Sequence, residues 1–237
     1  MSLTGKIALI TGGSRGIGYS IARLFAENGG KCIIVSRNLD SVQKAARSLP
    51  FPERKHLGVS HNVSQPWTDD PFEPIDIVVN AAGIPQNSLL MRLKTEEIDA
   101  LIDTNLKGSI LTTKKFVPSL LKTKGCIVHV SSVLGSIGSP GSSVYAASKV
   151  GIEGFSRSLA AELGPKGVRS NVIVPGLVET DMTKTIAPKI LEQMKTKIPL
   201  ARLGTPEEIA HTALFLATNN YINGASIRVD GGMSTSL

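Results

Sequence analysis

The 237-residue sequence is poor in aromatic side chains and cysteines, and its apolar runs are all short. Phe, Trp and Tyr make up 4% of the residues, and lysine and arginine form no block, so a nucleic-acid-binding role is not expected. No uninterrupted apolar run is long enough to span a bilayer, so no membrane span is predicted. The four histidines are scattered without metal-ligand spacing, so no metal site is predicted. One of them, His129, is expected to lie on a strand and to face away from any site.

Both cysteines, Cys32 and Cys126, lie in apolar runs, which favours buried thiols over a disulfide and indicates a reducing, intracellular setting. The N-terminal stretch "MSLTGKIALITGG" enters an apolar strand pattern almost at once and leaves no room for a secretory signal or a long transit peptide. An intracellular location is therefore expected, in the cytoplasm or the mitochondrial matrix.

Charge and hydrophobicity are more informative about what the chain can do. The formal charge of +7, from 26 basic and 19 acidic residues, favours anionic ligands or an acidic partner. Hydrophobic residues make up 41% of the chain, which is typical of a globular protein, and the length suits one large α/β domain.

Apolar strand patterns alternate with helical patterns along the whole chain. The expected strands are 6–10, 31–36, 75–80, 125–132, 168–174 and 225–232, and the expected helices include 18–30, 38–49, 106–121, 145–164 and 205–218. Asn38 and Thr205 are predicted helix N-caps, and Thr205 with Glu208 forms a capping box. This alternation predicts a doubly wound, Rossmann-like α/β fold with a parallel sheet, in a single domain over residues 1–237. The stretch 62–76 contains three prolines and predicts a short or broken helix on the outer face.

The stretch "TGGSRGIG" directly follows the first strand pattern and opens the first helix pattern. Gly12 would allow a tight turn, Gly16 a close approach of backbone N–H groups to a diphosphate, and Gly18 close packing of the helix on the strand. The N-terminus of the helix would face the diphosphate with its partial positive charge. The second strand pattern ends in Ser36 and Arg37 without an acid, and Arg37 together with Arg15 could bracket a 2′-phosphate. The sequence therefore predicts NADPH (or NADP) as cofactor.

Tyr145 and Lys149 lie four residues apart in "SSVYAASK", on one face of an expected helix. Taken alone, the pair could be a surface tyrosine beside a solvated lysine. A tyrosine with its ordinary pKa of about 10 shares its proton poorly at neutral pH. An ammonium about 5 Å away contributes roughly 3 kcal/mol at an effective dielectric near 20, which would lower that pKa by about two units.

Over essentially its whole length the chain resembles the short-chain dehydrogenase/reductase family. The motifs "TGGSRGIG", "NAAG", "TNLKG", "SSV", "YAASK" and "VPGLVETDM" occur in the family's order. Within that family it is most similar to the 3-oxoacyl-[acyl-carrier-protein] reductases, including the carbonyl reductase 4 type, through "NSLLMRLKTEE", "IPLARLGTPEEIA" and "VDGGM". It departs from many relatives in "NAAG", in "HNV" and in the short proline-rich segment.

The resemblance implies four catalytic residues, which are Asn105, Ser132, Tyr145 and Lys149. Tyr145 would donate the proton, Ser132 would orient the substrate oxygen, and Lys149 would hold the nicotinamide ribose. Asn105 would anchor a water relay to Lys149, although from the residue alone it could equally be a helix-bend or cap asparagine. The implied cofactor-binding residues are Gly12, Ser14, Arg15, Gly16, Ile17, Gly18, Arg37, Asn62, Val63, Asn80, Ala81, Ala82, Gly83, Tyr145, Lys149, Pro175, Gly176, Val178 and Thr180.

Three functions remain open at this point. The first is NADPH-dependent reduction of 3-oxoacyl thioesters on acyl carrier protein in fatty-acid synthesis, and the second is a broad carbonyl or quinone reductase. The third is a non-catalytic nucleotide-binding subunit of a hetero-oligomer, which should have lost a catalytic residue. None of the four is lost.

The resemblance also implies a homotetramer that pairs through the helices of 106–121 and 151–163, and a substrate lid at about 181–200. An acidic acyl carrier protein would dock on basic residues at two helix ends, beside the substrate entrance. They are Lys114, Lys115, Lys122, Lys124, Lys166 and Arg169. From the residues alone, these could equally be solvated cations near helix C-termini.

Overall fold

A computed structural model of the chain describes residues 1–68, 74–184 and 188–235. A seven-stranded parallel sheet in the order β3-β2-β1-β4-β5-β6-β7 runs through the described residues. The strands are β1 (Ile7–Thr11), β2 (Lys31–Ser36), β3 (Leu57–Ser60), β4 (Ile77–Asn80), β5 (Cys126–Val130), β6 (Arg169–Pro175) and β7 (Ser226–Val229). Strand order reverses between β1 and β4, which is where open sheets of this kind bind ligands.

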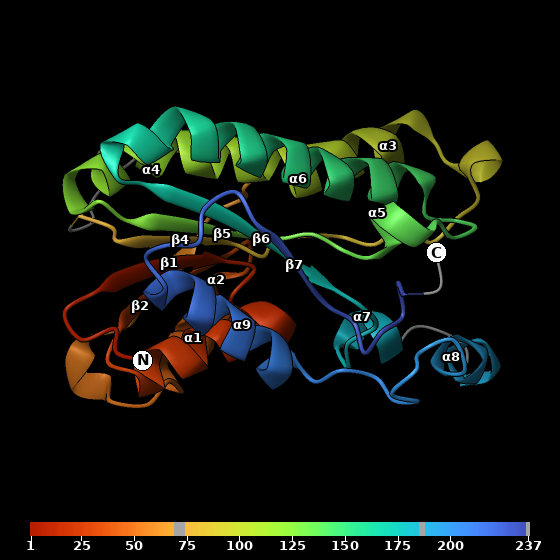
Figure 1. Ribbon diagram of the computed structural model, residues 1–237, viewed down its shortest axis with the longest axis horizontal. Helices are drawn as coiled ribbons and strands as arrows, with labels where there is room; N and C mark the ends of the chain where they lie inside the picture. The colour runs from red at the N-terminus through yellow and green to blue at the C-terminus, as the bar shows by residue number, and fades with distance from the viewer. Residues whose placement is uncertain (69–73, 185–187, 236–237) are drawn as a thin grey trace.

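Helices cover both faces of the sheet (Figure 1). On one face lie α1 (Gly16–Glu27), α2 (Leu39–Arg47) and α9 (Pro206–Thr218), and on the other lie α3 (Thr95–Ile102), α4 (Gly108–Thr123) and α6 (Ser143–Leu163). The shorter helices are α5 (Leu134–Ile137), α7 (Asp181–Lys184) and α8 (Pro188–Lys195), with single turns at Pro52–Arg54, Leu90–Arg92 and Gly164–Lys166 and a π-helix at Asp103–Lys107. The predicted doubly wound fold is confirmed.

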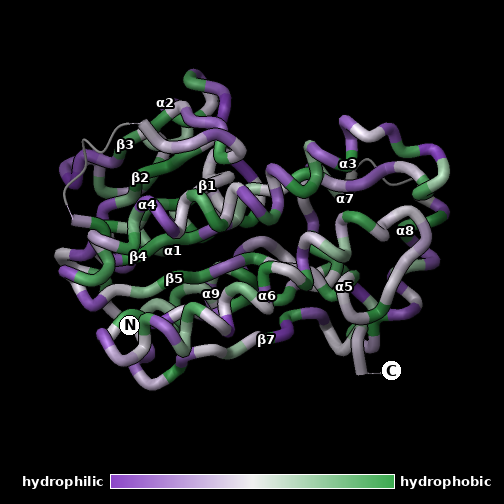
Figure 2. Tube along the Cα trace, turned by 90° about the horizontal axis from the view of Figure 1, so that it is seen from above, coloured by the Kyte–Doolittle hydropathy of each residue, from purple (hydrophilic) through white to green (hydrophobic). Residues whose placement is uncertain are grey.

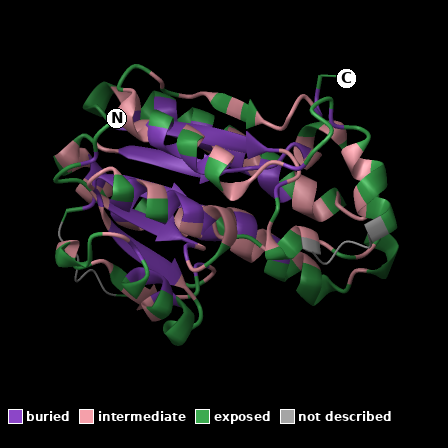
Figure 3. Cartoon of the chain, turned by 90° about the horizontal axis from the view of Figure 1, so that it is seen from below, coloured by how far each residue is buried: buried purple, intermediate pink, exposed green. Residues whose placement is uncertain are grey.

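Alternation along the strands divides the core into two layers. Ile10 of β1 packs with Phe25 of α1, whereas the preceding Leu9 packs with Phe116 of α4 on the opposite face. Successive strand residues point to opposite faces, so a strand covered on both sides must be apolar throughout. Figure 2 shows hydrophobic residues along the central strands, and Figure 3 shows those central strands buried.

Local signals in the sequence account for several helix ends. The Asn38 side chain accepts a hydrogen bond from Ser41 N at 2.8 Å, as predicted for an N-cap. Thr205 and Glu208 form the predicted capping box at the start of α9. Cys32 and Cys126 are both buried free thiols, as predicted, and burial raises the pKa of Cys32 to about 12.

Two parts of the chain differ from the expectations. The edge strand β3 was not expected, because it is short and half exposed; a Cβ at its Gly58 would lie 2.5 Å from Val42 backbone atoms, so α2 can pack directly on it. In the proline-rich stretch, 61–68 and 74–76 contain no helix, and 69–73 lie outside the described residues. In the described part of this stretch, the Trp67 ring stacks on His61 and packs edge-on against Phe116 of α4. The indole therefore covers α4 where a helix was expected.

Candidate functional site

The candidate site lies at the C-terminal edge of the sheet, where neighbouring parallel strands end together. β1 leads into the glycine turn, β4 into Asn80–Gly83, β5 into Ser132, and β6 into the segment 175–180. Four motifs from distant parts of the sequence therefore converge at one edge.

The glycine turn requires glycine for two reasons. Gly12 and Gly16 have φ of +66° and +55°, which favour a residue without Cβ. A Cβ at Gly18 would collide with the Gly12 carbonyl, and one at Gly12 would lie 2.8 Å from the Ala81 oxygen. The turn is thus held close to both α1 and the loop after β4.

Helix α1 begins in this turn without a side-chain cap. Its N-cap residue, Arg15, makes no capping hydrogen bond, and no acid lies in the first turn. The first N–H groups of a helix have no partner within the helix, so an anion can be bound there. Thr180 lies across from this turn, since a Cβ at Gly16 would be 3.5 Å from Thr180 Cγ2. These residues fit a diphosphate.

The far end of the predicted cofactor site combines a cation with a polar turn. Arg37 follows β2 and is exposed, and among the described residues no carboxylate forms an ion pair with it. Asn62 Oδ1 accepts from Ser64 N and Ser64 Oγ, which shapes the turn after β3, while Val63 is buried. Arg37 is therefore available to a phosphate, and Asn62 is partly engaged in local structure.

Thr11 joins the two loops, and its role was not anticipated from the sequence. Its Oγ1 accepts from Ala81 N at 3.2 Å and Ala82 N at 3.3 Å, and it donates to Val79 O. Its only signal is a hydroxyl residue at a strand end directly before the glycines. Thr11 fixes the start of "NAAG" relative to the glycine turn.

Tyr145, Lys149 and Ser132 meet between the first turns of α6 and the end of β5. The Tyr145 phenol lies close enough to Ser132 for their side chains to interact, and Lys149 Nζ lies 5.7 Å from the centroid of the Tyr145 ring. The ammonium is buried and donates to Val130 O at 2.9 Å. A hydroxyl, a phenol and an amine are thus gathered within one small region.

The expectation for the Tyr145 pKa is wrong. Burial raises the pKa of the phenol, and the hydrogen bond with Ser132 opposes this only in part. Burial also lowers the pKa of Lys149 to about 8, which weakens its hold on a positive charge. The sequence argument placed the ammonium beside the phenol but could not include the burial of both groups.

Asn105 lies in the π-helix between α3 and α4, a feature that often marks functional sites. Its Oδ1 accepts from Ile84 N at 2.8 Å, and its Nδ2 donates to Ile84 O and to Ser148 Oγ. A Cβ at Gly83 would lie 3.4 Å from both Asn105 Oδ1 and Lys149 Nζ. The structure therefore brings Asn105 close to Lys149, while its side chain also holds the loop after β4.

His129 is on β5 as expected, but it does not face away from the site. Its ring is fully buried, and its Nδ1 lies 3.2 Å from Nδ2 of Asn80. Burial and the charge of Lys149 lower its pKa to about 3, so the imidazole stays neutral. His129 supports Asn80 from within the sheet.

Hydrogen bonds hold the segment 175–180, which follows β6, on both sides. Gly176 N donates to Val229 O, and Val178 pairs with Gly204 as an isolated bridge. The Thr180 N–H is held by Thr183 Oγ1 at 2.9 Å. The predicted lid at 181–200 contains α7 and α8, and its residues 185–187 lie outside the described part of the chain.

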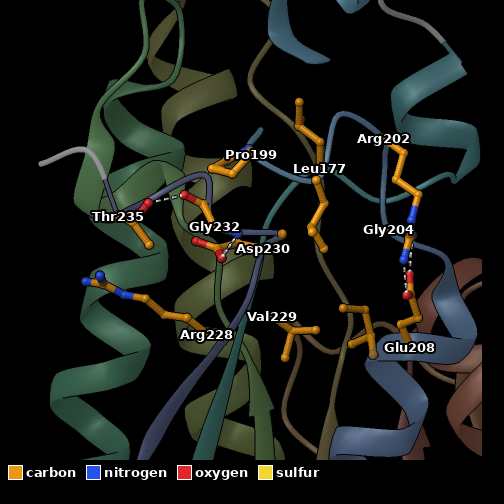
Figure 4. Close-up of a pocket in the computed structure, with 13 residues that line it drawn as sticks. Leu177, Pro199, Arg202, Gly204, Glu208, Arg228, Val229, Asp230, Gly232 and Thr235 are labelled. Atoms are coloured by element: carbon orange, nitrogen blue, oxygen red, sulfur yellow. Dashed lines mark hydrogen bonds and ion pairs between the residues drawn. The ribbon is translucent and has the colours of Figure 1, made fainter. Parts of the chain in front are cut away.

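A pocket of about 540 Å³ lies behind this segment (Figure 4). Its wall includes Leu177, Gly204 and the Arg202–Glu208 ion pair, in which the Nη2–Oε1 distance is 2.6 Å. It shares none of the predicted catalytic or cofactor-binding residues. The pocket therefore lies behind the segment 175–180 and is separate from the candidate site.

The basic cluster was expected beside the substrate entrance. Within a single chain, that expectation is wrong. Tyr145 is near the start of α6 and Lys166 is just past its end, so the helical rise places the end of α6 roughly 27 Å from Tyr145, with Lys166 beyond it. Arg169 is not available for docking, because its guanidinium donates to the carbonyls of Leu216, Ala217 and Ile222. Lys122 and Lys124 lie at the C-terminal end of α4, and Lys114 and Lys115 lie near its middle.

Two other kinds of site are absent from the parts of the chain that the structure describes. No helix there is long and apolar enough to cross a membrane. No group of His, Cys, Asp and Glu side chains within the described ranges could hold a metal ion.

Comparisons with known proteins agree with this geometry. A family model described as "Enoyl-(Acyl carrier protein) reductase" matches residues 12–234. The chain is 44% identical to a 3-oxoacyl-[acyl-carrier-protein] reductase FabG of Chlamydia muridarum, over 98% of each chain. It is 42% identical to carbonyl reductase family member 4 of Danio rerio, over 96% of this chain and 98% of the relative. A solved "short chain dehydrogenase/reductase family protein" superimposes with a TM-score of 0.85 and 32% identity, over 98% of each chain.

Proposed function

The chain belongs to the short-chain dehydrogenase/reductase family and is a nicotinamide-dependent oxidoreductase, and on that premise we propose that it reduces 3-oxoacyl thioesters to 3-hydroxyacyl thioesters with NADPH. The observation that carries this proposal is the meeting of Ser132, Tyr145 and Lys149 at the sheet edge where α1 presents its uncapped first turn. Bound NADPH supplies the hydride for the ketone carbon.

The chain's own residues supply the proton and hold the ketone. Tyr145 is the proposed proton donor to the developing alkoxide. Burial raises the pKa of the phenol and makes it a weaker acid, so the donation depends on the positive charge of Lys149 close to its ring. The hydroxyl of Ser132, at the end of β5, orients the substrate oxygen toward that phenol. Lys149 carries its charge below a pKa of about 8 and stabilises negative charge nearby. Asn105, which lies close to Lys149, is the fourth proposed catalytic residue.

The choice of NADPH over NADH rests on the residues after β2. Ser36 and Arg37 end that strand where an acid would hold a ribose 2′-hydroxyl, and no carboxylate in the described part of the chain pairs with Arg37. A guanidinium binds a 2′-phosphate through charge-assisted hydrogen bonds. Arg15 is a weaker contributor, because its guanidinium lies 3.4 Å from an Asp181 carboxylate.

A second candidate function, a broad carbonyl or quinone reductase, is favoured by the similarity to carbonyl reductase family member 4. Both functions use the same residues, so kinetics must separate them. The test compares kcat/KM for acetoacetyl and longer 3-oxoacyl thioesters with kcat/KM for small ketones and quinones. A preference for quinones would reject the thioester proposal, and no turnover by the purified chain alone would favour the non-catalytic subunit.

We also propose a homotetramer that assembles through α4 and α6. A groove of about 270 Å³ runs between these helices on their outer face, lined by Ile110, Val117, Phe155 and Leu159. Near the middle of α6, Gly154 is exposed, and a Cβ there would meet nothing within 4 Å, so a second helix can approach closely. A monomeric mass in light scattering at micromolar concentration would contradict this.

This assembly changes where an acidic acyl carrier protein would dock. If α6 pairs antiparallel with its copy, Lys166 of the partner subunit comes to the Tyr145 end of the first subunit. The KM for a carrier-linked substrate should then rise with salt and in Lys166→Glu, because exposed charges are screened beyond about 8 Å at physiological ionic strength. The KM for the same acyl group on a small thiol is the control; equal responses would reject carrier docking.

The location proposed for the enzyme is the mitochondrial matrix or the cytoplasm. Its support is the pair of buried free thiols, which suits a reducing compartment. Fractionation of the source cells would test it, and recovery from an oxidising compartment would reject it.

A further inference from the structure

The helix that carries Tyr145 does not cap its own N-terminus. The residue before α6, Ser142, has φ −129° and ψ 11° and makes no capping hydrogen bond through its side chain, and no acid lies in the first turn. The first N–H groups of the helix therefore need acceptors from elsewhere. Tyr145 is the third residue of α6, so its own backbone N–H is one of these groups.

Gln86 supplies the missing cap from a distant part of the chain. Its Oε1 accepts from Val144 N at 2.9 Å and from Tyr145 N at 3.1 Å. The other end of the same amide is also occupied, since Nε2 donates to Ser88 O at 2.8 Å. Two N–H donors on one side and a carbonyl on the other fix the direction of the amide, so the oxygen must face the helix.

The loop that carries Gln86 is tied at its beginning as well. Asn105 accepts from Ile84 N at 2.8 Å and donates to Ile84 O at 3.1 Å. Residues 84–86 therefore form a short strap from the Asn105 side chain to the backbone of Tyr145. Movement of this strap would move the start of α6 and, with it, the phenol relative to Ser132.

We propose that Gln86 is a positioning residue for the proposed reduction, acting on Tyr145 through the first turn of α6. This inference rests on the proposed function, because it requires Tyr145 to be the proton donor. A general acid must reach the proton acceptor within hydrogen-bond distance. Misplacement of such a group by about 1 Å can lower the rate about 100-fold.

The test uses substitutions at Gln86 that separate the effect of its hydrogen-bond acceptor from the effect of its side-chain size. Gln86→Met keeps a similar length but offers no oxygen, and we expect kcat to fall at least about tenfold while the Kd for NADPH stays within about twofold. Gln86→Glu keeps an oxygen for both N–H groups and loses only the bond to Ser88, so kcat should stay within about threefold of the unchanged protein. Asn87→Ala, on the next and exposed residue, is the matched control and should leave both quantities unchanged.

A merely structural role would lower the melting temperature, NADPH binding and kcat together in Gln86→Met, and that result would overturn the inference. An unchanged kcat in Gln86→Met, or a Gln86→Glu protein slowed tenfold or more, would overturn it as well. If Gln86→Met does not fold, the Gln86→Glu result decides alone. Tyr145→Phe is measured in parallel: if it keeps its turnover, the proposed proton donor is wrong, whereas an inactive Tyr145→Phe beside a normal Gln86→Met rejects only the role of Gln86.

Discussion

Helices α1 and α6 both begin at the candidate-site edge of the sheet, but their first turns are arranged in opposite ways. The first turn of α1 has no side-chain cap and lies in a glycine turn that backbone atoms approach closely. The first turn of α6 is closed by Gln86 from another part of the chain. An open helix N-terminus is suited to bind an anion, whereas a capped one is suited to hold a side chain in place.

Helix α9 provides a third case. Its capping box is made by Thr205 and Glu208, three residues apart, and Glu208 also pairs with Arg202. This cap stabilises a helix that carries none of the predicted catalytic or cofactor-binding residues. On the proposed assignment, the starts of α1, α6 and α9 serve cofactor binding, catalysis and stability respectively, and substitutions can test that separation.

The largest effect is expected at α6. In Tyr145→Phe, kcat should fall about 1,000-fold because the proton donor is lost, while NADPH binding stays within about twofold because little contact area is removed. Steady-state kinetics and NADPH fluorescence titration measure the two quantities. Tyr19→Phe is the matched control on α1: it removes a hydroxyl that bonds Ser48, and kcat should not change. Substantial turnover by Tyr145→Phe would contradict the assignment.

The next effect is expected at α1. In Gly18→Ala the new methyl group collides with the Gly12 carbonyl and displaces the first turn of the helix. The affinity for NADPH should fall about 100-fold, as expected for a displacement near 1 Å in a preorganised site. Circular dichroism establishes that the variant is folded. A folded Gly18→Ala protein with unchanged NADPH affinity would show that the α1 turn does not bind the cofactor.

A smaller effect tests the charge near α1. In Arg37→Asp the ratio of kcat/KM for NADPH to that for NADH should fall roughly 30-fold, because a charge-assisted hydrogen bond of about 2 kcal/mol is lost. Arg47→Asp is the matched control, since it makes the same charge change at an exposed position at the end of α2. Equal ratios in both variants would mean that the general field of the protein, and not a contact at Arg37, sets the preference.

The pH dependence of cofactor binding tests Lys149. Its pKa is lowered to about 8 by burial, so the amine is charged below pH 8 and neutral above it. NADPH affinity of the free enzyme should therefore weaken about fivefold as the pH rises from 7 to 9, because a charged hydrogen-bond donor becomes neutral. In Lys149→Met the affinity should be lower and should not vary over this range. The same pH dependence in both proteins would assign it to another group.

The smallest effect is expected at α9. Thr205→Ala removes an N-cap and should lower the free energy of unfolding by about 1 kcal/mol. For a chain of this size that corresponds to a melting temperature lower by about 2–4 °C. Turnover and NADPH affinity should not change, and a fall in either would show that the cap of α9 also supports the candidate site.

Much of the site was accessible from the sequence because its signals are local. Gly12, Gly16 and Gly18 occur together directly after a strand pattern, and Tyr145 and Lys149 are one helical turn apart. The capping box of α9 also lies within one turn. In each case the covalent spacing alone brings the residues together.

What the sequence by itself determined is the alternation of the main strands and helices, the glycine turn and the residue types at the candidate site. Only the tertiary structure decided that Gln86 caps a helix that begins 57 residues later, that Asn105 holds Ile84, and that Lys166 lies at the opposite edge from Tyr145. It also decided the directions of the Tyr145 and Lys149 pKa shifts. The physical reason is the same throughout: spacing within a turn follows from covalent geometry, whereas burial and contacts between distant segments exist only after the layers have packed.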